Sequence, residues 1–278
     1  MATFSSLWIG ATLSPVEHLC IRSFLDHGHA FELYTYGSVA DVPEGCAVLD
    51  ANCILGEDQV FAYRRGKGTG SYGAFANRFR YKLLLERGGW WVDTDVVCMS
   101  PLIADADVQL AHEDEKTVGN AILKFPAGHS CMEIAFARAT AAGHDVRWGQ
   151  TGPTLMSALA RSCSLESFLA PTAAFYPLHW SEFSSLIRPD RYDHVERKVA
   201  GATFLHLWNE MFRRAHYNKH YRPPRGSYLA ELFARHDMAQ RFRHEYVALG
   251  DDEPQRLDVV PIEAASRAGR GAGAGPDS

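Results

Sequence analysis

Two carboxylates inside an apolar run are the sharpest chemical feature of this sequence. Asp93 and Asp95 flank Thr94, and the other residues of the stretch 90–97 are apolar. Burying two carboxylates costs free energy unless an opposite charge pairs with them. In a β-strand, residues two apart point to the same side, so both carboxylates would face one spot. Such hard oxygen ligands suit a Mn²⁺ or Mg²⁺ ion that bridges the oxygens of a diphosphate.

The segment before this run is expected to position further polar groups. Apolar side chains recur every four positions over residues 75–87, which predicts a helix, and Gly88-Gly89 ends it. Asn77 and Arg80 lie three apart on another side of this helix, so both can reach one ligand. The basic, glycine-rich stretch 64–73 is expected to form a loop that closes over a bound ligand.

The N-terminal part has the pattern of a βαβ unit. An apolar run at 6–9 predicts a strand, and Ser14-Pro15-Val16-Glu17 is a capping box that starts a helix ending at Gly28. Residues 30–36 and 47–50 predict two more strands. We therefore expect an α/β fold with a mostly parallel central sheet flanked by helices. Further elements are predicted as helices at 131–142 and 154–162 and a strand at 202–208.

Composition argues against several classes of protein. The chain has 278 residues, a formal net charge of −5 and six cysteines, none of them in a Cys-x-x-Cys pair. The acidic balance argues against a nucleic-acid partner, and the scattered cysteines argue against a zinc site or a disulfide framework. A signal-peptide pattern and an apolar run of ~20 residues are both missing, so we expect no transmembrane segment. The expected location is the cytoplasm, either free or peripheral to the inner face of the membrane.

The sequence resembles a group of retaining GT-A glycosyltransferases. This group contains yeast mannosyltransferases, animal α-1,4-galactosyltransferases and bacterial capsule-synthesis transferases. The stretch 79–95 carries its signature, which is a helix with an arginine, Gly-Gly, an aromatic pair and Asp-x-Asp. Three further segments match the group: Leu7-Trp8-Ile9-Gly10, Thr151-Gly152-Pro153 and His206-Leu207-Trp208-Asn209. The resemblance implies a GT-A-like, Rossmann-type nucleotide-sugar-binding domain over residues 1–263. The stretch 264–278 is mostly Ala, Gly and Arg without an apolar period, which predicts a disordered tail.

The resemblance also implies roles for single residues. Trp8 would stack on the uracil ring of the donor, and Arg80 would contact the donor's sugar or phosphates. Asp93 would hold ribose or sugar hydroxyls, while Asp95 would bind the metal with His206 as a further ligand. The expected catalytic residues are Asp93, Asp95 and Arg80, and the expected metal ligands are Asp95, Asp93 and His206. The expected donor-binding residues are Trp8, Asn77, Arg80, Asp93, Gly152, Trp208 and Asn209.

Other residues are expected to complete the pocket. Asn77 falls where some relatives have an aspartate that bonds sugar hydroxyls, and Gly152 would present backbone N–H groups at a helix N-terminus. Trp208 and Asn209 would close the same pocket. The acidic cluster 113–115 is expected to be a solvated loop, although this whole cluster and Asn120 could line the acceptor side.

Several of these residues also have a purely structural interpretation. Trp8 could be a core tryptophan, Arg80 could form a surface salt bridge with Glu86 or another acid, and His206 could be a satisfied core histidine. Asp93 and Asp95 could both face solvent at a strand edge, because a bare Asp-x-Asp pattern is common. The structure must decide between these interpretations.

The function predicted from these residues is metal-dependent sugar transfer with retention of configuration. The donor would be a nucleotide sugar, expected to be a UDP-sugar, and the acceptor a glycan, a small glycoside or another hydroxyl compound. A haloacid-dehalogenase-type phosphatase is one alternative, since 93–97 fits its Asp-x-Asp-x-(Thr/Val) motif, with Asp251 and Asp252 as the downstream acids. Dinucleotide binding through the Gly-x-Gly-x-x-Gly match at 68–73 is another. A non-catalytic glycan-binding module is the third.

Overall fold

A central five-stranded sheet organises the fold. The computed structural model describes residues 1–248 and 257–262. The strand order is β3-β2-β1-β4-β7, and every neighbouring pair is parallel except β4 with β7. This confirms the predicted α/β fold with a mostly parallel sheet. The strands are β1 (Thr3–Trp8), β2 (Ala30–Thr35), β3 (Ala47–Asp50), β4 (Gly89–Val92) and β7 (Ile122–Phe125).

The βαβ unit forms as its local signals predict. Helix α1 (Pro15–Asp26) begins with the complete capping box, in which the Ser14 hydroxyl accepts from the backbone N–H of Val16 and Glu17 reaches back to the backbone N–H of Ser14. Gly28, at φ +79°, follows the helix and allows the chain to turn into β2. Strands β1 and β2 then pair in parallel along their whole length.

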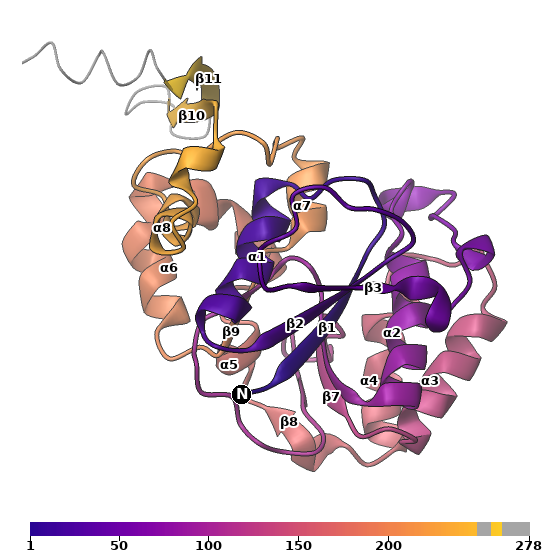
Figure 1. Ribbon diagram of the computed structural model, residues 1–278. Helices are drawn as coiled ribbons and strands as arrows, with labels where there is room; N and C mark the ends of the chain where they lie inside the picture. Colours follow the sequence, from indigo (N-terminus) through magenta and orange to yellow (C-terminus); the bar gives the residue numbers. More distant parts are fainter. Residues whose placement is uncertain (249–256, 263–278) are drawn as a thin grey trace, which may run out of the picture.

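Helices cover both faces of the sheet, as Figure 1 shows. Alternate residues of each strand point to opposite faces, so Phe4 and Trp90 pack with α1 in one cluster, while Leu7 and Trp91 pack on the other side. Helices α2 (Gly73–Arg87), α3 (Ser130–Ala141) and α4 (Pro153–Ser162) cover that second face. The helices predicted at 75–87, 131–142 and 154–162 are therefore confirmed, with ends shifted by one or two residues.

The expected strand over 90–97 is wrong. Strand β4 ends at Val92, and β5 (Val96–Cys98) leaves the central sheet to pair antiparallel with β9 (Phe204–His206). A turn joins β4 to β5, closed by a 3.1 Å hydrogen bond from the Val96 N–H to the Asp93 carbonyl. Asp93 and Asp95 therefore lie in a turn between two sheets, and strand alternation does not orient them. The strand predicted at 202–208 is also shorter than expected, because only 204–206 pair.

The C-terminal half packs against α1 and β5 through a third hydrophobic cluster. Its helices α6 (Tyr192–Val199) and α8 (Tyr228–Arg235) are drawn in salmon and orange to the left of α1 in Figure 1. This half also contains β8 (Leu169–Ala170), α5 (Thr172–Phe175), α7 (Asn209–Arg214) and the hairpin of β10 (His244–Ala248) with β11 (Leu257–Pro261). The short strand β6 (Leu110–Ala111) pairs with β8. Short 3₁₀ turns lie at Ala51–Cys53, Glu57–Gln59, Gly66–Gly68, Glu166–Phe168, Trp180–Ile187, Pro189–Arg191 and Ala239–Arg241.

Two of the sequence expectations concern residues that the structure does not describe. They are the tail at 264–278 and the acids Asp251 and Asp252 of the phosphatase alternative.

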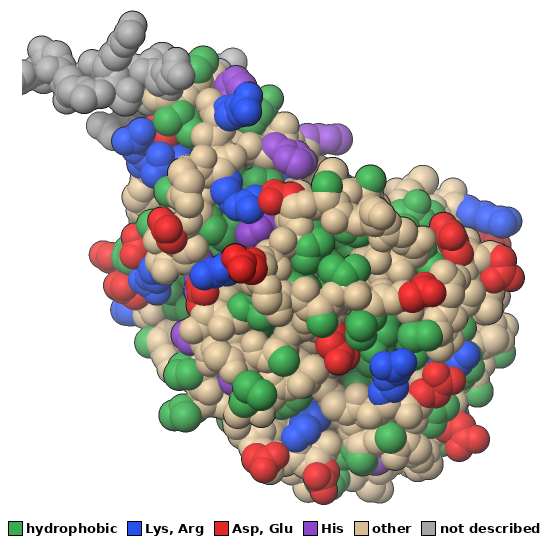
Figure 2. All heavy atoms as spheres, viewed as in Figure 1, with side chains coloured by type: hydrophobic (Ala, Val, Ile, Leu, Met, Phe, Trp, Pro, Cys, Tyr) green, Lys and Arg blue, Asp and Glu red, His purple; other side chains and the backbone are tan. Residues whose placement is uncertain are grey.

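Among the described helices, none combines the length and the apolar character needed to cross a membrane. On the face shown in Figure 2, acidic and basic side chains are interspersed rather than gathered by sign.

Candidate active site

The turn after β4 presents the two carboxylates. The N–H of Asp93 donates to the Ala121 carbonyl at 2.8 Å, which fixes the start of the turn against β7. The Asp95 side chain is 12% exposed, whereas 29% of the Asp93 side chain remains exposed. The interpretation of two acids facing solvent at a strand edge is therefore wrong.

Asp95 is tied to the C-terminal half through the pairing of β5 with β9. The register places Val96 opposite His206, and the Leu207 N–H donates to the Asp95 carbonyl at 2.9 Å. One side-chain oxygen of Asp95, Oδ2, then lies 3.2 Å from His206 Nε2 and accepts from the Asn209 N–H at 2.8 Å. Residues more than a hundred positions apart in the sequence thus meet at one carboxylate.

Asp93, Asp95 and His206 form a compact group of ligands. One ligand atom from each residue lies within 4.8 Å of the others. Burial raises the pKa of Asp95, but His206 and the Asn209 N–H more than offset it and bring that pKa to about 2. Burial would lower the pKa of His206, yet Asp95 and Asp93 raise it above its ordinary value. Carboxylates are the ligands that Mn²⁺ and Mg²⁺ sites use, and an imidazole is a common ligand of divalent transition metals. Among the described residues, the buried Nδ1 of His206 has no hydrogen-bond partner. The residues therefore fit a divalent cation.

Arg80 is buried beside Asp93. Its side chain is 4% exposed, and its Nη2 lies 2.9 Å from Asp93 Oδ1. Its Nη1 donates to the Asn120 carbonyl, and its guanidinium carbon lies 5.0 Å from the centre of the Trp91 ring. The suggested surface salt bridge with Glu86 is wrong, because the ion pair of Glu86 is with Lys82 on the same helix. Arg80 is instead a fixed cation in the wall of the site.

Asn77 and Gly152 pack closely against each other. The Asn77 amide donates to Thr151 Oγ1 at 3.2 Å and accepts from Asn120 Nδ2 at 2.7 Å. A Cβ at Gly152 would lie 3.0 Å from Asn77 Nδ2, so glycine permits this close packing at the start of α4. Asn77 thus lines the site with an amide that is already bonded on both sides, and Gly152 packs beneath it.

Two cavities meet at the carboxylates. The cavity that we name the Trp8 cavity has a volume of about 450 Å³, and the one that we name the Trp180 cavity has about 480 Å³. Arg80, Asp93 and Asp95 line both. The Trp8 cavity is also lined by Trp8, Thr94, Asn209, Tyr217 and Lys219, and the Trp180 cavity by Asn77, Glu113, Trp148, Trp180 and His206.

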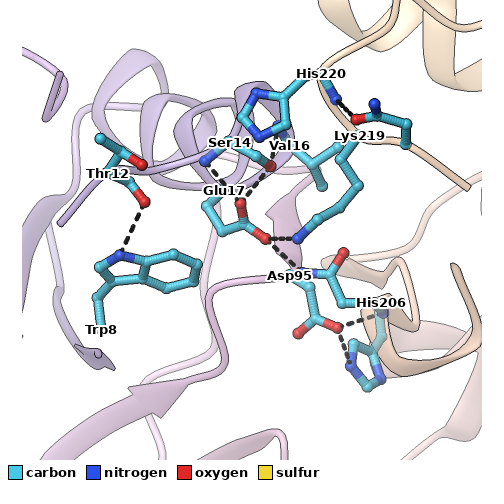
Figure 3. Close-up of polar contacts among 11 residues, drawn as sticks. Trp8, Thr12, Ser14, Val16, Glu17, Asp95, His206, Lys219 and His220 are labelled. Carbon is cyan, nitrogen blue, oxygen red and sulfur yellow. Dashed lines mark hydrogen bonds and ion pairs between the residues drawn. The ribbon is translucent and has the colours of Figure 1, made fainter. Parts of the chain in front are cut away.

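Trp8 is a cavity residue. The indole is half-buried and its Nε1 donates to the Thr12 carbonyl at 3.1 Å, as Figure 3 shows. A Cβ at Gly10 would lie 3.2 Å from that nitrogen, so the turn after β1 holds the ring closely. The interpretation of Trp8 as a core tryptophan is therefore wrong.

The indole of Trp208 packs against the imidazole of His206. Its backbone adopts a left-handed conformation at φ 61°, its ring centre lies 4.0 Å from that of His206, and its Nε1 donates to the Leu178 carbonyl at 2.9 Å. Trp208 lines the Trp180 cavity, whereas Asn209 lines the Trp8 cavity. The two residues expected to close one pocket thus lie on either side of Asp95.

Glu17 connects the N-terminal helix to the site, and the sequence suggested only its capping role. The carboxylate is fully buried. Its Oε2 accepts from the Ser14 N–H at 3.0 Å, while its Oε1 accepts from Asn209 Nδ2 at 2.7 Å and pairs with Lys219. Figure 3 shows Lys219 reaching Glu17 beside Asp95 and His206. The capping box was the signal that could have located Glu17, but its partners come from distant segments.

Glu113 is not part of a solvated loop, as the sequence had suggested. The residue is partly buried in the wall of the Trp180 cavity. Burial raises the pKa of its carboxyl to about 7; His206 opposes this increase, while Asp114 and Asp93 add to it. Trp148 and Trp180, which the sequence analysis did not single out, line the same cavity.

The structure also bears on two rival functions. Residues 58–65, which precede the glycine match at 68–73, contain no strand, so the dinucleotide-binding interpretation is wrong. The phosphatase motif is expected on a first strand that runs into the acids, whereas Asp93 follows β4 and begins a turn.

Comparison with known proteins gives one match to a protein family and several distant matches to solved structures. A search of the curated proteins finds no match to this sequence. PaToxG glycosyltransferase aligns with a TM-score of 0.43 and 11% identity over 60% of this chain and 71% of that one. A transferase carrying two cysteine-to-serine substitutions aligns with a TM-score of 0.39 and 8% identity over 61% of this chain and 87% of that one. Apo GlyE, a glycosyltransferase of Streptococcus pneumoniae, aligns with a TM-score of 0.38 and 12% identity over 74% of this chain and 54% of that one.

The sequence match lies in the part of the chain that supplies His206. The matched family is described as the alpha 1,4-glycosyltransferase conserved region, and the match covers residues 124–236. Gly152, His206, Trp208 and Asn209 fall inside this range, whereas Asp93 and Asp95 precede it. Residues 124–236 of this chain are thus similar to the conserved region of the alpha 1,4-glycosyltransferases.

Proposed function

We propose that this chain is a metal-dependent glycosyltransferase that moves a sugar from a UDP-sugar to a hydroxyl acceptor with retention of configuration. The observation that carries the proposal is the group formed by Asp93, Asp95 and His206 where two cavities meet. The match of residues 124–236 to a glycosyltransferase region supports the class of reaction.

The carboxylates and His206 would hold a divalent cation, which supplies charge stabilisation to the departing nucleoside diphosphate. Arg80 fixes Asp93 in place through a 2.9 Å ion pair and supplies a buried positive charge of its own. Lys219 adds a second cation on the wall of the Trp8 cavity. Fixed charges of this kind stabilise developing negative charge without reorganising during the reaction.

The two cavities suggest how the donor lies. The uracil ring would stack on Trp8, so that the diphosphate extends toward Asp95 and Lys219. The sugar would then project past Asp93 and Arg80 toward Asn77 and Asn120, which line the other cavity. An acceptor hydroxyl that attacks from the same face as the departing phosphate would give retention. A trapped glycosyl-enzyme or an inverted product would refute this stereochemical part of the proposal.

The test is donor binding with and without metal. We expect UDP or a UDP-sugar to raise the melting temperature only when Mn²⁺ or Mg²⁺ is present, because a ligand that binds the native state stabilises it. UDP-glucose, UDP-galactose, UDP-N-acetylglucosamine and GDP-mannose would be compared in the same way. Failure of all of them to shift the melting temperature would contradict the proposal.

Asp95→Asn sharpens this test. The amide keeps the shape of the side chain and an oxygen for the Asn209 N–H, but it removes the charge. We expect metal-dependent hydrolysis of the donor to fall by at least about 100-fold, comparable to the loss of one electrostatic contact at an active site. Asp190→Asn is the matched control, since Asp190 pairs with Arg188 at the surface. Normal hydrolysis by Asp95→Asn across a range of metal concentrations would overturn the assignment.

A further inference from the structure

The Trp180 cavity has a composition that the donor does not explain. Trp148 is 43% exposed and Trp180 is 44% exposed, although both are large apolar side chains. Both line the same cavity, and neither lines the Trp8 cavity. Exposed apolar surface costs roughly 25 cal/mol per Å², so two half-exposed indoles beside the carboxylates indicate a surface that a ligand covers.

The two indoles are held differently. Trp148 is fixed: its ring centre lies 5.2 Å from that of Tyr63, and the Arg214 guanidinium carbon lies 4.9 Å from it. Gly68 permits this packing, because a Cβ there would lie 2.3 Å from the indole. Trp180 contacts only the ring of its neighbour His179 among the described aromatic and charged side chains. Trp148 is therefore a rigid wall, and Trp180 offers an open indole surface.

The charged groups of this cavity indicate a neutral ligand. Basic and acidic side chains line the cavity in similar numbers, so neither sign dominates it: Lys67, Arg80 and Arg214 against Asp93, Asp95, Glu113 and Glu210. Among the described residues, no side chain donates a hydrogen bond to the Glu113 carboxylate. Its oxygens can thus accept from hydroxyl groups of a ligand.

We propose that the part of the Trp180 cavity lined by Trp180 and Glu113 is the acceptor site and that it binds a neutral carbohydrate, with the apolar face of a pyranose ring on Trp180 and its hydroxyls toward Glu113. This inference rests on the proposed function. The volume of about 480 Å³ falls within the range of small-molecule sites, about 300–1,000 Å³. A serine or threonine side chain of a protein acceptor has one hydroxyl and no apolar ring face, so it would leave both the indole and the carboxylate unmatched.

The arrangement of the two cavities predicts which substrate each tryptophan should bind. The two cavities share Arg80, Asp93 and Asp95, so a donor entering from Trp8 and an acceptor entering past Trp180 would meet at these residues. Loss of Trp8 should therefore weaken donor binding alone. Loss of Trp180 should weaken acceptor binding alone.

The experiment measures both substrates separately in each variant. Donor KM is measured from metal-dependent hydrolysis of the best UDP-sugar, and acceptor KM from transfer to the methyl α- and β-glycosides of glucose, galactose and mannose. We expect Trp180→Ala to raise acceptor KM about fivefold, the effect of one lost aromatic contact, and to leave donor hydrolysis unchanged. Trp180→Phe should restore most of the loss, and Trp8→Ala should show the opposite pattern. Phe168→Ala is the matched control, because Phe168 is 43% exposed and lines neither cavity.

The outcomes separate the two proposals. Absence of metal-dependent donor hydrolysis in the wild-type protein would refute the proposed function. Normal hydrolysis with an unchanged acceptor KM in Trp180→Ala would overturn the acceptor site alone. Transfer to serine, threonine or tyrosine peptides, but to none of the six glycosides, would overturn the carbohydrate assignment. A parallel rise of donor and acceptor KM in Trp180→Ala would show a structural role and would also overturn it.

Discussion

Replacing Glu113 with glutamine should make the protein more stable, and the gain should grow with pH. The partly buried carboxyl has a pKa of about 7, raised from its ordinary value of 4.5 mainly by burial. Because the folded-state pKa is the higher one, ionisation favours the unfolded chain as the pH rises above 4.5. This cost increases up to pH 7 and is constant above it. Glutamine removes the charge and therefore the cost.

The magnitude follows from the two pKa values. At 1.36 kcal/mol per pKa unit, the change from 4.5 to about 7 corresponds to about 3 kcal/mol at pH 8 and to less than about 1 kcal/mol at pH 5. The measurement is the free energy of unfolding in urea at pH 5, 6, 7 and 8. Metal is removed with EDTA, because a bound cation would itself favour the ionised carboxyl. Glu115→Gln, an exposed neighbour, is the matched control and should follow the wild-type curve at every pH.

Two results would refute this reasoning. Parallel curves for Glu113→Gln and wild type would show that the carboxyl does not titrate between 4.5 and 7. Destabilisation by Glu113→Gln at pH 8 would show that the ionised carboxylate makes favourable contacts in the folded protein. If the gain is observed, the chain retains a destabilising acid in the Trp180 cavity, a trade-off that is common at functional sites.

Two further predictions concern the scaffold. Glu17→Gln should lower the stability by roughly 2 kcal/mol and reduce the thermal shift with UDP and metal, because Lys219 loses its counter-charge and the amide keeps only one acceptor oxygen for the Ser14 N–H and the Asn209 amide. Glu231→Gln, which breaks an exposed ion pair on α8, should change stability by less than about 0.5 kcal/mol in the same urea titration. Gly88→Ala should lower the free energy of unfolding by more than about 2 kcal/mol, because the new Cβ would lie 2.4 Å from the Ala127 backbone nitrogen. Gly28 has a similar φ but open space around it, so Gly28→Ala should lower it by about 1 kcal/mol. Equal effects for the two glycines would show that the close approach at Gly88 does not matter.

The parts of the fold that local signals determine could be predicted from the sequence. The capping box at Ser14 and Glu17 and the Gly88-Gly89 pair each act within a few residues, so the boundaries of α1 and α2 follow from them. The strand, helix, strand spacing predicted the βαβ unit and the parallel sheet. Helix α2 and strand β4 bring Arg80 Nη2 to 2.9 Å from Asp93 Oδ1.

The parts that depend on distant pairing could not be predicted. The apolar run at 90–97 gives no sign that β5 leaves the sheet, because its partner β9 lies more than a hundred residues further along the chain. The sequence around Trp180 likewise does not indicate a binding role, because only the fold brings Trp180 into the same cavity as Asp93. Sequence patterns describe the period of an element, whereas the partner of an element follows only from the whole topology.

Asp95 serves both the structure and the proposed chemistry, and this determines how its variants should be interpreted. Its Oδ2 holds the Asn209 N–H and contacts His206, so it anchors the C-terminal half to the turn after β4. Removing the carboxylate altogether would leave a donor without a partner, at a cost of about 1–3 kcal/mol, and any loss of activity could come from that disorder. The asparagine variant keeps an oxygen for the N–H, removes the charge and replaces the other carboxylate oxygen with an amide NH₂. A loss of hydrolysis in Asp95→Asn with normal stability can therefore be assigned to the carboxylate that would hold the cation.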